Sequence, residues 1–237
     1  MRFIEFNGLP GCGKTTISGE LYNLMGAHGM PPVYYNDVRE KFPEGIWKRI
    51  LHIIFKLRLR EIADLYKISL CFDKISFKER WIRILYVEQI AYNYRKFQAD
   101  TRICIADQGL IQGIISIGYI HDFRSLASKS DFVHRTFEFL RPYYDEILFV
   151  STQIDVKDSY TRLRGRKNNF GRFDKVSDDD LLQLNLKKQE EIFRLIWESC
   201  ITKGIYAVTI NGNDSPKNNA EKVVTFYMDK GKKYECK

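Results

Sequence analysis

Residues 8–15 read GLPGCGKT, and this short stretch decides the fold. It fills every fixed position of the pattern GxxxxGK[ST], in which the backbone N–H groups of a glycine-rich loop surround a phosphate. The apolar run RFIEF precedes it at residues 2–6, and an apolar helical face that includes Ile17, Leu21 and Met25 follows it. A strand, a glycine-rich turn and a helix in this order predict a phosphate-binding loop at the start of an α/β domain.

The residues of this loop have distinct expected contacts with a purine triphosphate. Lys14 is expected to bridge the β- and γ-phosphates, and the hydroxyl of Thr15 is expected to bind Mg²⁺. Thr16 would extend the contacts to the α-phosphate, near a helix N-terminus that also favours an anion. The expected binding set for ATP is Gly8, Pro10, Gly11, Cys12, Gly13, Lys14, Thr15 and Thr16.

Short apolar runs alternate with long helical patterns along the rest of the chain, which is typical of a parallel sheet covered by helices. Runs this apolar suit strands that are buried on both faces. The predicted strands are residues 2–6, 33–35, 102–106, 146–150 and 205–210. We therefore expect an α/β fold, a three-layer sandwich with a five-stranded parallel sheet.

A long helical insert interrupts this alternation. Residues 42–100 contain no convincing strand and predict two helices that are separated near residues 69–73. No repeat, low-complexity tract or linker is recognisable, so residues 1–237 are expected to form a single domain. Further helices are expected after Asp107, over residues 177–203 behind the capping sequence SDDD, and after Pro216.

Composition and charge narrow the class of protein. Hydrophobic residues make up 44% of the chain and aromatic residues 14%, which favours a packed domain over a disordered one. No run of about 18 apolar residues predicts a membrane span, and no signal peptide is recognisable. Five scattered cysteines without a CxxC pair indicate reduced thiols and a cytoplasmic location. The net charge of +8 comes without a nucleic-acid motif and fits an anion-binding cleft better than a nucleic-acid partner.

An acidic residue ends one of the predicted strands. The sequence RICIADQG, residues 102–109, places Asp107 at the carboxyl end of a buried strand, where ligands of open α/β folds bind. Its carboxylate is expected to hold Mg²⁺ through water, beside the Thr15 hydroxyl, or to orient an attacking group. The alternative is that Asp107 only caps the helix that follows.

A basic segment later in the chain predicts a lid. The strand at 146–150 leads into a helix that is expected to carry Arg162 and Arg166 one turn apart, on one face. Arginines that close over a transferring phosphoryl group stabilise its negative charge, and the closure excludes water. Residues 162–174 are therefore the expected lid, and Arg162 is also an expected nucleotide contact. The alternative is an exposed basic loop.

The end of the last predicted strand offers a further contact. Residues 209–216 read TINGNDSP, with a turn at Asn211, Gly212 and Asn213 before the last helix. If the strands have the usual order, this turn lies close to the phosphate-binding loop. Backbone groups of the turn, beginning with Asn211, would then hold an edge of adenine. A plain connecting turn explains the same sequence.

These motifs, taken in order, resemble the thymidylate kinase and deoxynucleoside kinase group of P-loop kinases. Residues 143–166 resemble the fourth strand and lid helix of this group, GRFD at 171–174 resembles the stretch after the lid, and INGNDSP resembles the final strand with its proline-started helix. The resemblance implies a nucleotide kinase-like P-loop fold, ATP as donor, Mg²⁺ and a small-molecule acceptor, with a nucleoside or nucleotide favoured. Residues 42–100 would form the acceptor side. Members often pair through helices, so the resemblance also implies a homodimer.

The departures from this group fall where the acceptor would bind. Gln108 follows Asp107, whereas the group has an arginine that touches phosphate. The stretch YYNDVREKF replaces an acidic or arginine-containing signature after the second strand. There, Asp37 is expected to accept a proton from a substrate hydroxyl and Arg39 to hold an acceptor phosphate, unless both are turn residues. Arg80, in FKERW, lies near the position of a base-contacting arginine in thymidylate kinases.

The sequence thus predicts an ATP-dependent phosphotransferase that moves the γ-phosphoryl group to a small acceptor. The expected catalytic residues are Lys14, Asp37, Asp107, Arg162 and Arg166. Two alternatives stay open at this point: a kinase for a non-nucleoside small molecule such as a sugar, and a nucleotide-regulated switch that hydrolyses ATP slowly. The insert at 42–76 is longer than in thymidylate kinases, which indicates a rebuilt acceptor pocket.

Overall fold

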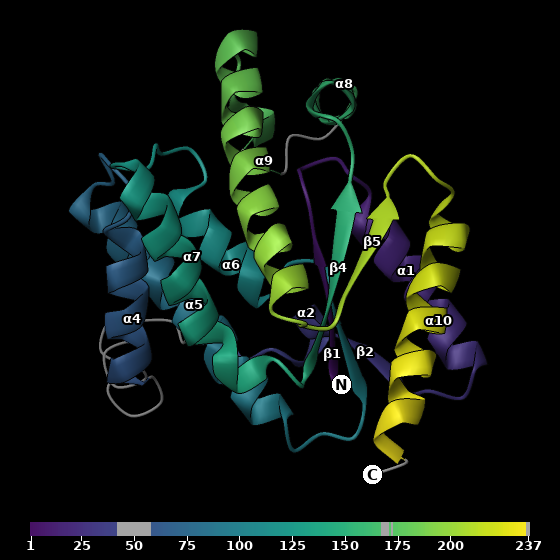
Figure 1. Ribbon diagram of the computed structural model, residues 1–237. Helices are drawn as coiled ribbons and strands as arrows, with labels where there is room; N and C mark the ends of the chain where they lie inside the picture. The colour runs from purple at the N-terminus through teal and green to yellow at the C-terminus, as the bar shows by residue number, and fades with distance from the viewer. Residues whose placement is uncertain (42–57, 167–170, 172, 236–237) are drawn as a thin grey trace.

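A computed structural model describes residues 1–41, 58–166, 171 and 173–235. Five strands of these residues form one sheet in which every neighbouring pair is parallel, in the order β2-β3-β1-β4-β5. Figure 1 shows this sheet between two layers of helices. The strands are β1 (Phe3–Asn7), β2 (Pro32–Tyr34), β3 (Ile103–Ala106), β4 (Ile147–Gln153) and β5 (Ala207–Asn211).

The helices cover both faces of the sheet. Helices α1 and α10 pack against each other on one face, whereas α5, α6, α7 and α9 contribute to the core on the other. Their bounds are α1 (Lys14–Ala27), α2 (Tyr35–Val38), α4 (Leu59–Ser69), α5 (Phe77–Phe97), α6 (Leu110–Gly118), α7 (Leu126–Leu140), α8 (Val156–Arg164), α9 (Asp179–Thr202) and α10 (Pro216–Glu235), with 3₁₀ turns at Arg141–Tyr143 and Phe173–Lys175.

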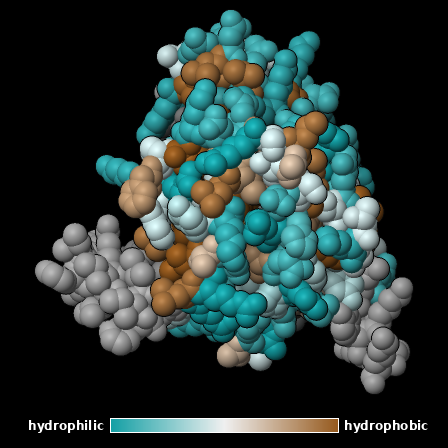
Figure 2. All heavy atoms as spheres, turned by 60° about the vertical axis from the view of Figure 1, so that its left-hand side comes forward, coloured by the Kyte–Doolittle hydropathy of each residue, from teal (hydrophilic) through white to brown (hydrophobic). Residues whose placement is uncertain are grey.

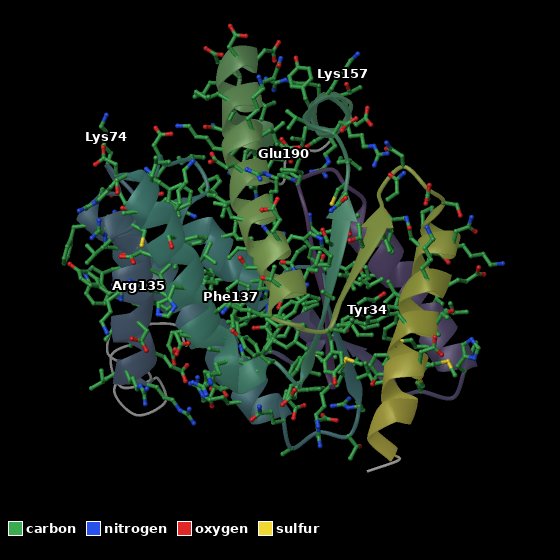
Figure 3. The ribbon with its side chains drawn as sticks, in the orientation of Figure 1. Tyr34, Lys74, Arg135, Phe137, Lys157 and Glu190 are labelled. Atoms are coloured by element: carbon green, nitrogen blue, oxygen red, sulfur yellow. The ribbon has the colours of Figure 1, made fainter. Side chains whose placement is uncertain are left out.

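The central strands are buried on both faces, which explains their uninterrupted apolar runs. Phe3 of β1 lies in the core beside α5 and α6, whereas its neighbour Ile4 lies in the core beside α1 and α10. In β4, Phe149 likewise lies in the core beside α5 and α6, and Leu148 lies in the core beside α1 and α10. Phe137 of α7 is buried in the first of these cores (Figure 3). Each such side chain contributes about 1.5–3 kcal/mol through burial, so both helical layers are firmly attached.

The register of the sheet brings the ends of four strands together. Because all strands are parallel, the loops that follow β1, β3, β4 and β5 emerge at one edge, which is uppermost in Figure 1. Ligands of open α/β sheets bind at this edge. The Cα partners near it are Glu5 with Ala106, Asn7 with Ser151, and Gln153 with Asn211.

The predicted strands and most predicted helices are confirmed. Each strand starts and ends within three residues of its expected bounds. Helix α9 begins after Asp178, whose side chain accepts a hydrogen bond from the N–H of Leu181 at 2.9 Å, as the capping sequence predicted. In the insert, residues 70–76 separate α4 from α5, and residues 42–57 lie outside the described residues.

One helix was not predicted, and one expected helix ends earlier than its arginines require. Helix α7 was not predicted, because most of its buried residues gather in its second half while its first turns read LASKS. Helix α8 ends at Arg164, with Gly165 as its C-cap, so Arg166 does not share a helical face with Arg162. Glycine is a poor helix former, and its position sets this end of the helix.

The helices of the described residues do not meet what a membrane span would need. None of the helices there is long and apolar enough to cross a bilayer. Figure 2 shows mostly hydrophilic side chains on one face, with hydrophobic ones among them. The exposed hydrophobic side chains of α4, α5 and α7 include Leu59, Phe77 and Leu126. The homodimer stays a prediction.

Candidate functional site

The loop between β1 and α1 depends on three glycines in the left-handed region. Gly8, Gly11 and Gly13 have φ angles of 151°, 82° and 95°, which residues with a side chain rarely adopt. A Cβ at Gly8 would also lie 2.3 Å from the carbonyl oxygen of Thr152, so β4 closely backs the loop. Helix α1 begins directly after Gly13, and a helix N-terminus of this kind favours an anion.

The side chain of Lys14 folds over the loop. Its Nζ donates to the carbonyl oxygens of Gly8 at 2.8 Å and Leu9 at 2.9 Å, and it lies 3.4 Å from Sγ of Cys12. Both carbonyls are neutral, so these contacts hold the ammonium group at the loop without cancelling its charge. Cys12 is fully buried, and its thiol forms part of the packing of the loop.

Thr15 and Asp107 meet beside the loop. Asp107 directly follows the last residue of β3, and its Oδ2 accepts a hydrogen bond from Oγ1 of Thr15 at 3.0 Å. The N-cap of α6 is Gly109, so the alternative that Asp107 only caps this helix is wrong. A hydroxyl and a carboxylate are oxygen ligands of the kind that Mg²⁺ prefers, so this pair fits the ion.

The structure reveals a buried carboxylate that the sequence analysis did not single out. Glu5 of β1 is fully buried and accepts hydrogen bonds from the backbone N–H groups of Leu110, Ile111 and Gln112 and from the hydroxyl of Tyr94. Burial raises the pKa of Glu5 to about 7, although the backbone donors act in the opposite direction. The available signal was a lone acidic residue inside the apolar run RFIEF.

Arg162 of α8 joins the loop to the last turn. Its guanidinium group donates to the carbonyl oxygens of Gly11 at 3.2 Å and Gly212 at 3.0 Å, and to Oδ1 of Asn213 at 2.6 Å. Ser159 of the same helix donates to the carbonyl oxygen of Pro10 at 2.6 Å. The structure therefore brings the loop, α8 and the turn after β5 into one cluster.

The other arginines of the expected lid differ in what they contact. Arg166 lies 3.5 Å from Oδ1 of Asp174, a carboxylate that is almost fully buried. Arg164 instead pairs with the start of α9 and donates to carbonyl oxygens that precede it. Residues 167–170 and 172 of the lid lie outside the described residues.

The loop opens into a cavity of about 730 Å³. Arg162 and Arg166 line it together with the loop, and further lining side chains come from α5, α6, α9 and the segments beside them. The part of the cavity wall outside the loop combines aromatic rings with amides and hydroxyls, a composition that suits a planar ring with polar edges. Its side chains include Tyr86, Gln108, Gln112, Ser116, Tyr119, Phe173 and Gln189.

Two amides of this wall are notable. The Oε1 atoms of Gln112 and Gln189 are buried and have no hydrogen-bond partner among the described residues. Gln189 is only 3% exposed, although it comes from the middle of α9. A buried amide oxygen without a partner is costly, so both positions favour a ligand with hydrogen-bond donors.

The residues expected to contact the acceptor lie elsewhere. Asp37, in the first turn of α2, is exposed and is not among the described residues that line the cavity. Arg39 lies over the ring of Tyr35, with 6.0 Å between its guanidinium carbon and the ring centroid. Arg80 lies over the ring of Tyr66 at 5.6 Å. Both arginines therefore pack on aromatic rings outside the cavity wall.

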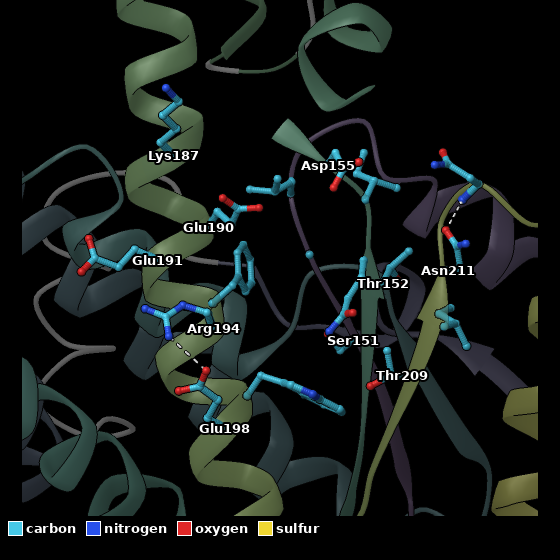
Figure 4. A pocket seen from close by; sticks show the side chains of 18 of the residues that line it. Ser151, Thr152, Asp155, Lys187, Glu190, Glu191, Arg194, Glu198, Thr209 and Asn211 are labelled. Atoms are coloured by element: carbon cyan, nitrogen blue, oxygen red, sulfur yellow. Dashed lines mark hydrogen bonds and ion pairs between the residues drawn. The ribbon is translucent and has the colours of Figure 1, made fainter. Parts of the chain in front are cut away.

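A second cavity, of about 990 Å³, lies between α9 and the strands β4 and β5 (Figure 4). Asn211, the expected adenine contact, lines this second cavity. Its Oδ1 accepts a hydrogen bond from the N–H of Asn213 at 2.9 Å, so its side chain orders the turn. On the opposite wall, Arg194 and Glu198 form an ion pair at 3.0 Å.

Comparisons with known proteins show the fold. Neither a protein-family model nor a curated protein matches the chain. A structure of deoxyadenosine kinase from M. mycoides with bound dATP is similar, with a TM-score of 0.50 and 13% identity over 95% of this chain and 98% of that chain. A second structure of that enzyme, with the products dCMP and a flexible dCDP, has a TM-score of 0.50 and 12% identity over 96% and 99% of the two chains. The chain therefore has the α/β fold of nucleotide kinases, with its strand order 2-3-1-4-5.

Proposed function

We propose that this protein is a phosphotransferase of the nucleoside or nucleotide kinase type, which moves the γ-phosphoryl group of ATP to a small acceptor. The observation that carries the proposal is the 3.0 Å hydrogen bond between Thr15 and Asp107, beside a glycine loop that holds Lys14. The glycine loop, Lys14 and Thr15 line a single cavity, and Asp107 is hydrogen-bonded to the Thr15 hydroxyl beside it.

At the donor end, the protein has little covalent chemistry to perform. The loop and Lys14 would hold the β- and γ-phosphates, and Thr15 and Asp107 would hold Mg²⁺. When bound, the ion supplies neutralisation of the charge that develops on the phosphoryl oxygens. Arg162 and Arg166 line the same cavity and would add positive charge to it.

At the acceptor end, the cavity wall favours a nucleoside or nucleotide over a sugar. The rings of Tyr86, Tyr119 and Phe173 offer flat apolar surface, and the amides of Gln112 and Gln189 offer hydrogen bonds. The structurally similar deoxyadenosine kinase binds deoxynucleotides, which agrees with this preference. Asp37, expected from the sequence to accept the proton of the acceptor hydroxyl, is exposed and does not line this cavity, so we assign no base among the described lining residues.

The test is a search for ADP formation with Mg²⁺ and ATP in a panel of nucleosides, nucleoside monophosphates and sugars. We expect a nucleoside or a monophosphate to accelerate ADP release, and Lys14→Ala to lower kcat/KM by roughly 100-fold or more, since it removes a charge at the transferring group. Lys217→Ala, an exposed lysine on α10, is the matched control and should leave the rate unchanged. Full activity of the Lys14→Ala variant, or acceleration by sugars alone, would contradict the proposal.

A further inference from the structure

The central strand carries a carboxylate where an apolar side chain would be expected. Glu5 points into the core beside α5 and α6 and has no exposed surface. Its Oε2 accepts from the N–H of Leu110 at 2.8 Å and the hydroxyl of Tyr94 at 3.2 Å, and its Oε1 accepts from the N–H groups of Ile111 at 2.7 Å and Gln112 at 3.2 Å. Four donors thus converge on one side chain.

These hydrogen bonds make Glu5 the cap of α6. The first N–H groups of a helix have no partner within it and need acceptors from elsewhere. The N-cap residue of α6, Gly109, has no side chain to supply one, and the first turn contains no acidic residue. Glu5 supplies the acceptors from a neighbouring strand, and when it is ionised its negative charge also favours the helix N-terminus.

Glu5 also fixes the segment that precedes α6. The Cα atom of Glu5 pairs with that of Ala106 in the sheet, so the end of β3 is held against β1. Only residues 107–109 connect this point to Leu110, whose N–H bonds to the Glu5 side chain. One residue therefore anchors both ends of the three-residue connector that contains Asp107.

The geometry points to Glu5 as a positioning residue that sets where Asp107 meets Thr15 and where Gln112 faces the cavity. This inference rests on the proposed function, because it assigns Glu5 a part in the same transfer without contact to either substrate. The connector is tightly fitted: a Cβ at Gly109 would lie 2.3 Å from Cδ of Glu5. A shift of about 1 Å in a catalytic group can cost about 100-fold in rate, so a fitted anchor has a direct effect on transfer.

The principal variant is Glu5→Gln, which keeps the shape of the side chain but replaces one acceptor oxygen with an NH₂ group that faces hydrogen-bond donors. We expect kcat to fall by roughly tenfold to a hundredfold. The Mg²⁺ concentration that gives half-maximal binding of a fluorescent ATP analogue should also rise. Circular dichroism and thermal melting would establish that the variant is folded at the assay temperature. Tyr94→Phe, which removes one donor and keeps the three backbone bonds, should show a smaller change in both quantities.

Glu88→Gln is the matched control for the loss of a buried carboxylate. Glu88 of α5 is also fully buried, and its Oε1 accepts from the N–H of Arg58 and from the guanidinium group of Arg95, outside the cavity lining. We expect Glu88→Gln to lower the melting temperature without changing kcat or the Mg²⁺ requirement. The inference would be overturned if Glu5→Gln lowered the melting temperature as much as Glu88→Gln does and left kcat unchanged. That result would show that Glu5 acts only on stability.

A double-mutant cycle tests whether Glu5 acts through Asp107. If it does, Glu5→Gln should reduce Mg²⁺-dependent nucleotide binding far less in an Asp107→Asn background than in the wild type. Additive effects would overturn this assignment. The two proposals fail in different ways: if the wild type binds no Mg²⁺-nucleotide, the proposed function fails. If Asp107→Asn weakens that binding and Glu5→Gln does not, only the inference about Glu5 fails.

Discussion

The carboxyl group of Glu5 makes the stability of the protein depend on pH. Burial raises the pKa of Glu5 from 4.5 to about 7, so the folded state binds this proton more tightly than the unfolded chain does. The contribution to stability is therefore complete below pH 4.5 and is lost as the pH rises through 7. We expect this group alone to lower the free energy of unfolding by about 3 kcal/mol across that range.

Urea unfolding at pH 5 and pH 8 would measure this effect. The Glu5→Gln variant has no titrating group at this position, so its stability should fall less between the two pH values than that of the wild type. Other buried acids, such as Glu88, are common to both proteins and cancel in the comparison. Parallel pH profiles for the two proteins would contradict the prediction.

Single residues of the site differ in how well the sequence predicts them. Lys14 and Thr15 follow from a local motif, and Asp107 follows from its place at a strand end; the structure brings the last two within 3.0 Å. Glu5 and Gln189 could not be predicted in this way. The hydrogen-bond donors to Glu5 lie about 90 or more residues away in the sequence. Gln189 lines a cavity whose other lining residues come from distant parts of the chain. A local sequence pattern contains no information about such contacts.

At the scale of elements, helix α6 is joined to β1 by the contact between Glu5 and Gly109. We expect Gly109→Ala to destabilise the protein by about 1–3 kcal/mol, because its methyl group would overlap Cδ of Glu5 and the hydroxyl of Tyr94. Gly26→Ala is the matched control, since nothing lies within 4 Å of a Cβ there and the residue is inside α1. The free energy of unfolding of that variant should rise by about 0.4–1 kcal/mol. Chemical denaturation of both variants would show whether Gly109→Ala is less stable and Gly26→Ala more stable than the wild type.

The elements themselves were largely predictable, and the exceptions have local causes. Strands buried on both faces read as continuous apolar runs, so all five were expected near their actual bounds. Helix α7 was missed because Phe137, Phe139 and Leu140 are crowded at its C-terminal end rather than forming a stripe along its length. Helix α8 ended earlier than expected because Gly165 outweighed the spacing of the arginines around it.

Across the whole molecule, Arg162 connects three segments that are far apart in the sequence. Without its guanidinium group, the loop carbonyl of Gly11 and the turn at Gly212 and Asn213 lose a shared donor. We expect Arg162→Ala to raise the KM for ATP by roughly tenfold, since each hydrogen bond to a charged group is worth about 1.5–3 kcal/mol in favourable cases. Steady-state kinetics with varied ATP would measure this KM for the variant and the wild type.

Arg164→Ala is the control for Arg162, two positions further along the same helix. Its side chain pairs with Asp179 on the surface, and the KM for ATP should stay unchanged. Equal changes in both variants would show that the general basic charge of this segment, rather than the bridge, sets the KM. Arg162 reaches this bridge because of the strand order β2-β3-β1-β4-β5, which the sequence analysis assumed as a condition and did not predict.

The close fit between Glu5 and Gly109 also constrains how this sequence can diverge. A side chain at position 109 needs space that Cδ of Glu5 and the hydroxyl of Tyr94 occupy, so a larger residue there requires changes at positions 5 and 94 first. The intermediate that has lost Glu5 has an uncapped α6 N-terminus and is less stable than the present sequence. Positions 5, 94 and 109 are therefore expected to change together rather than one at a time.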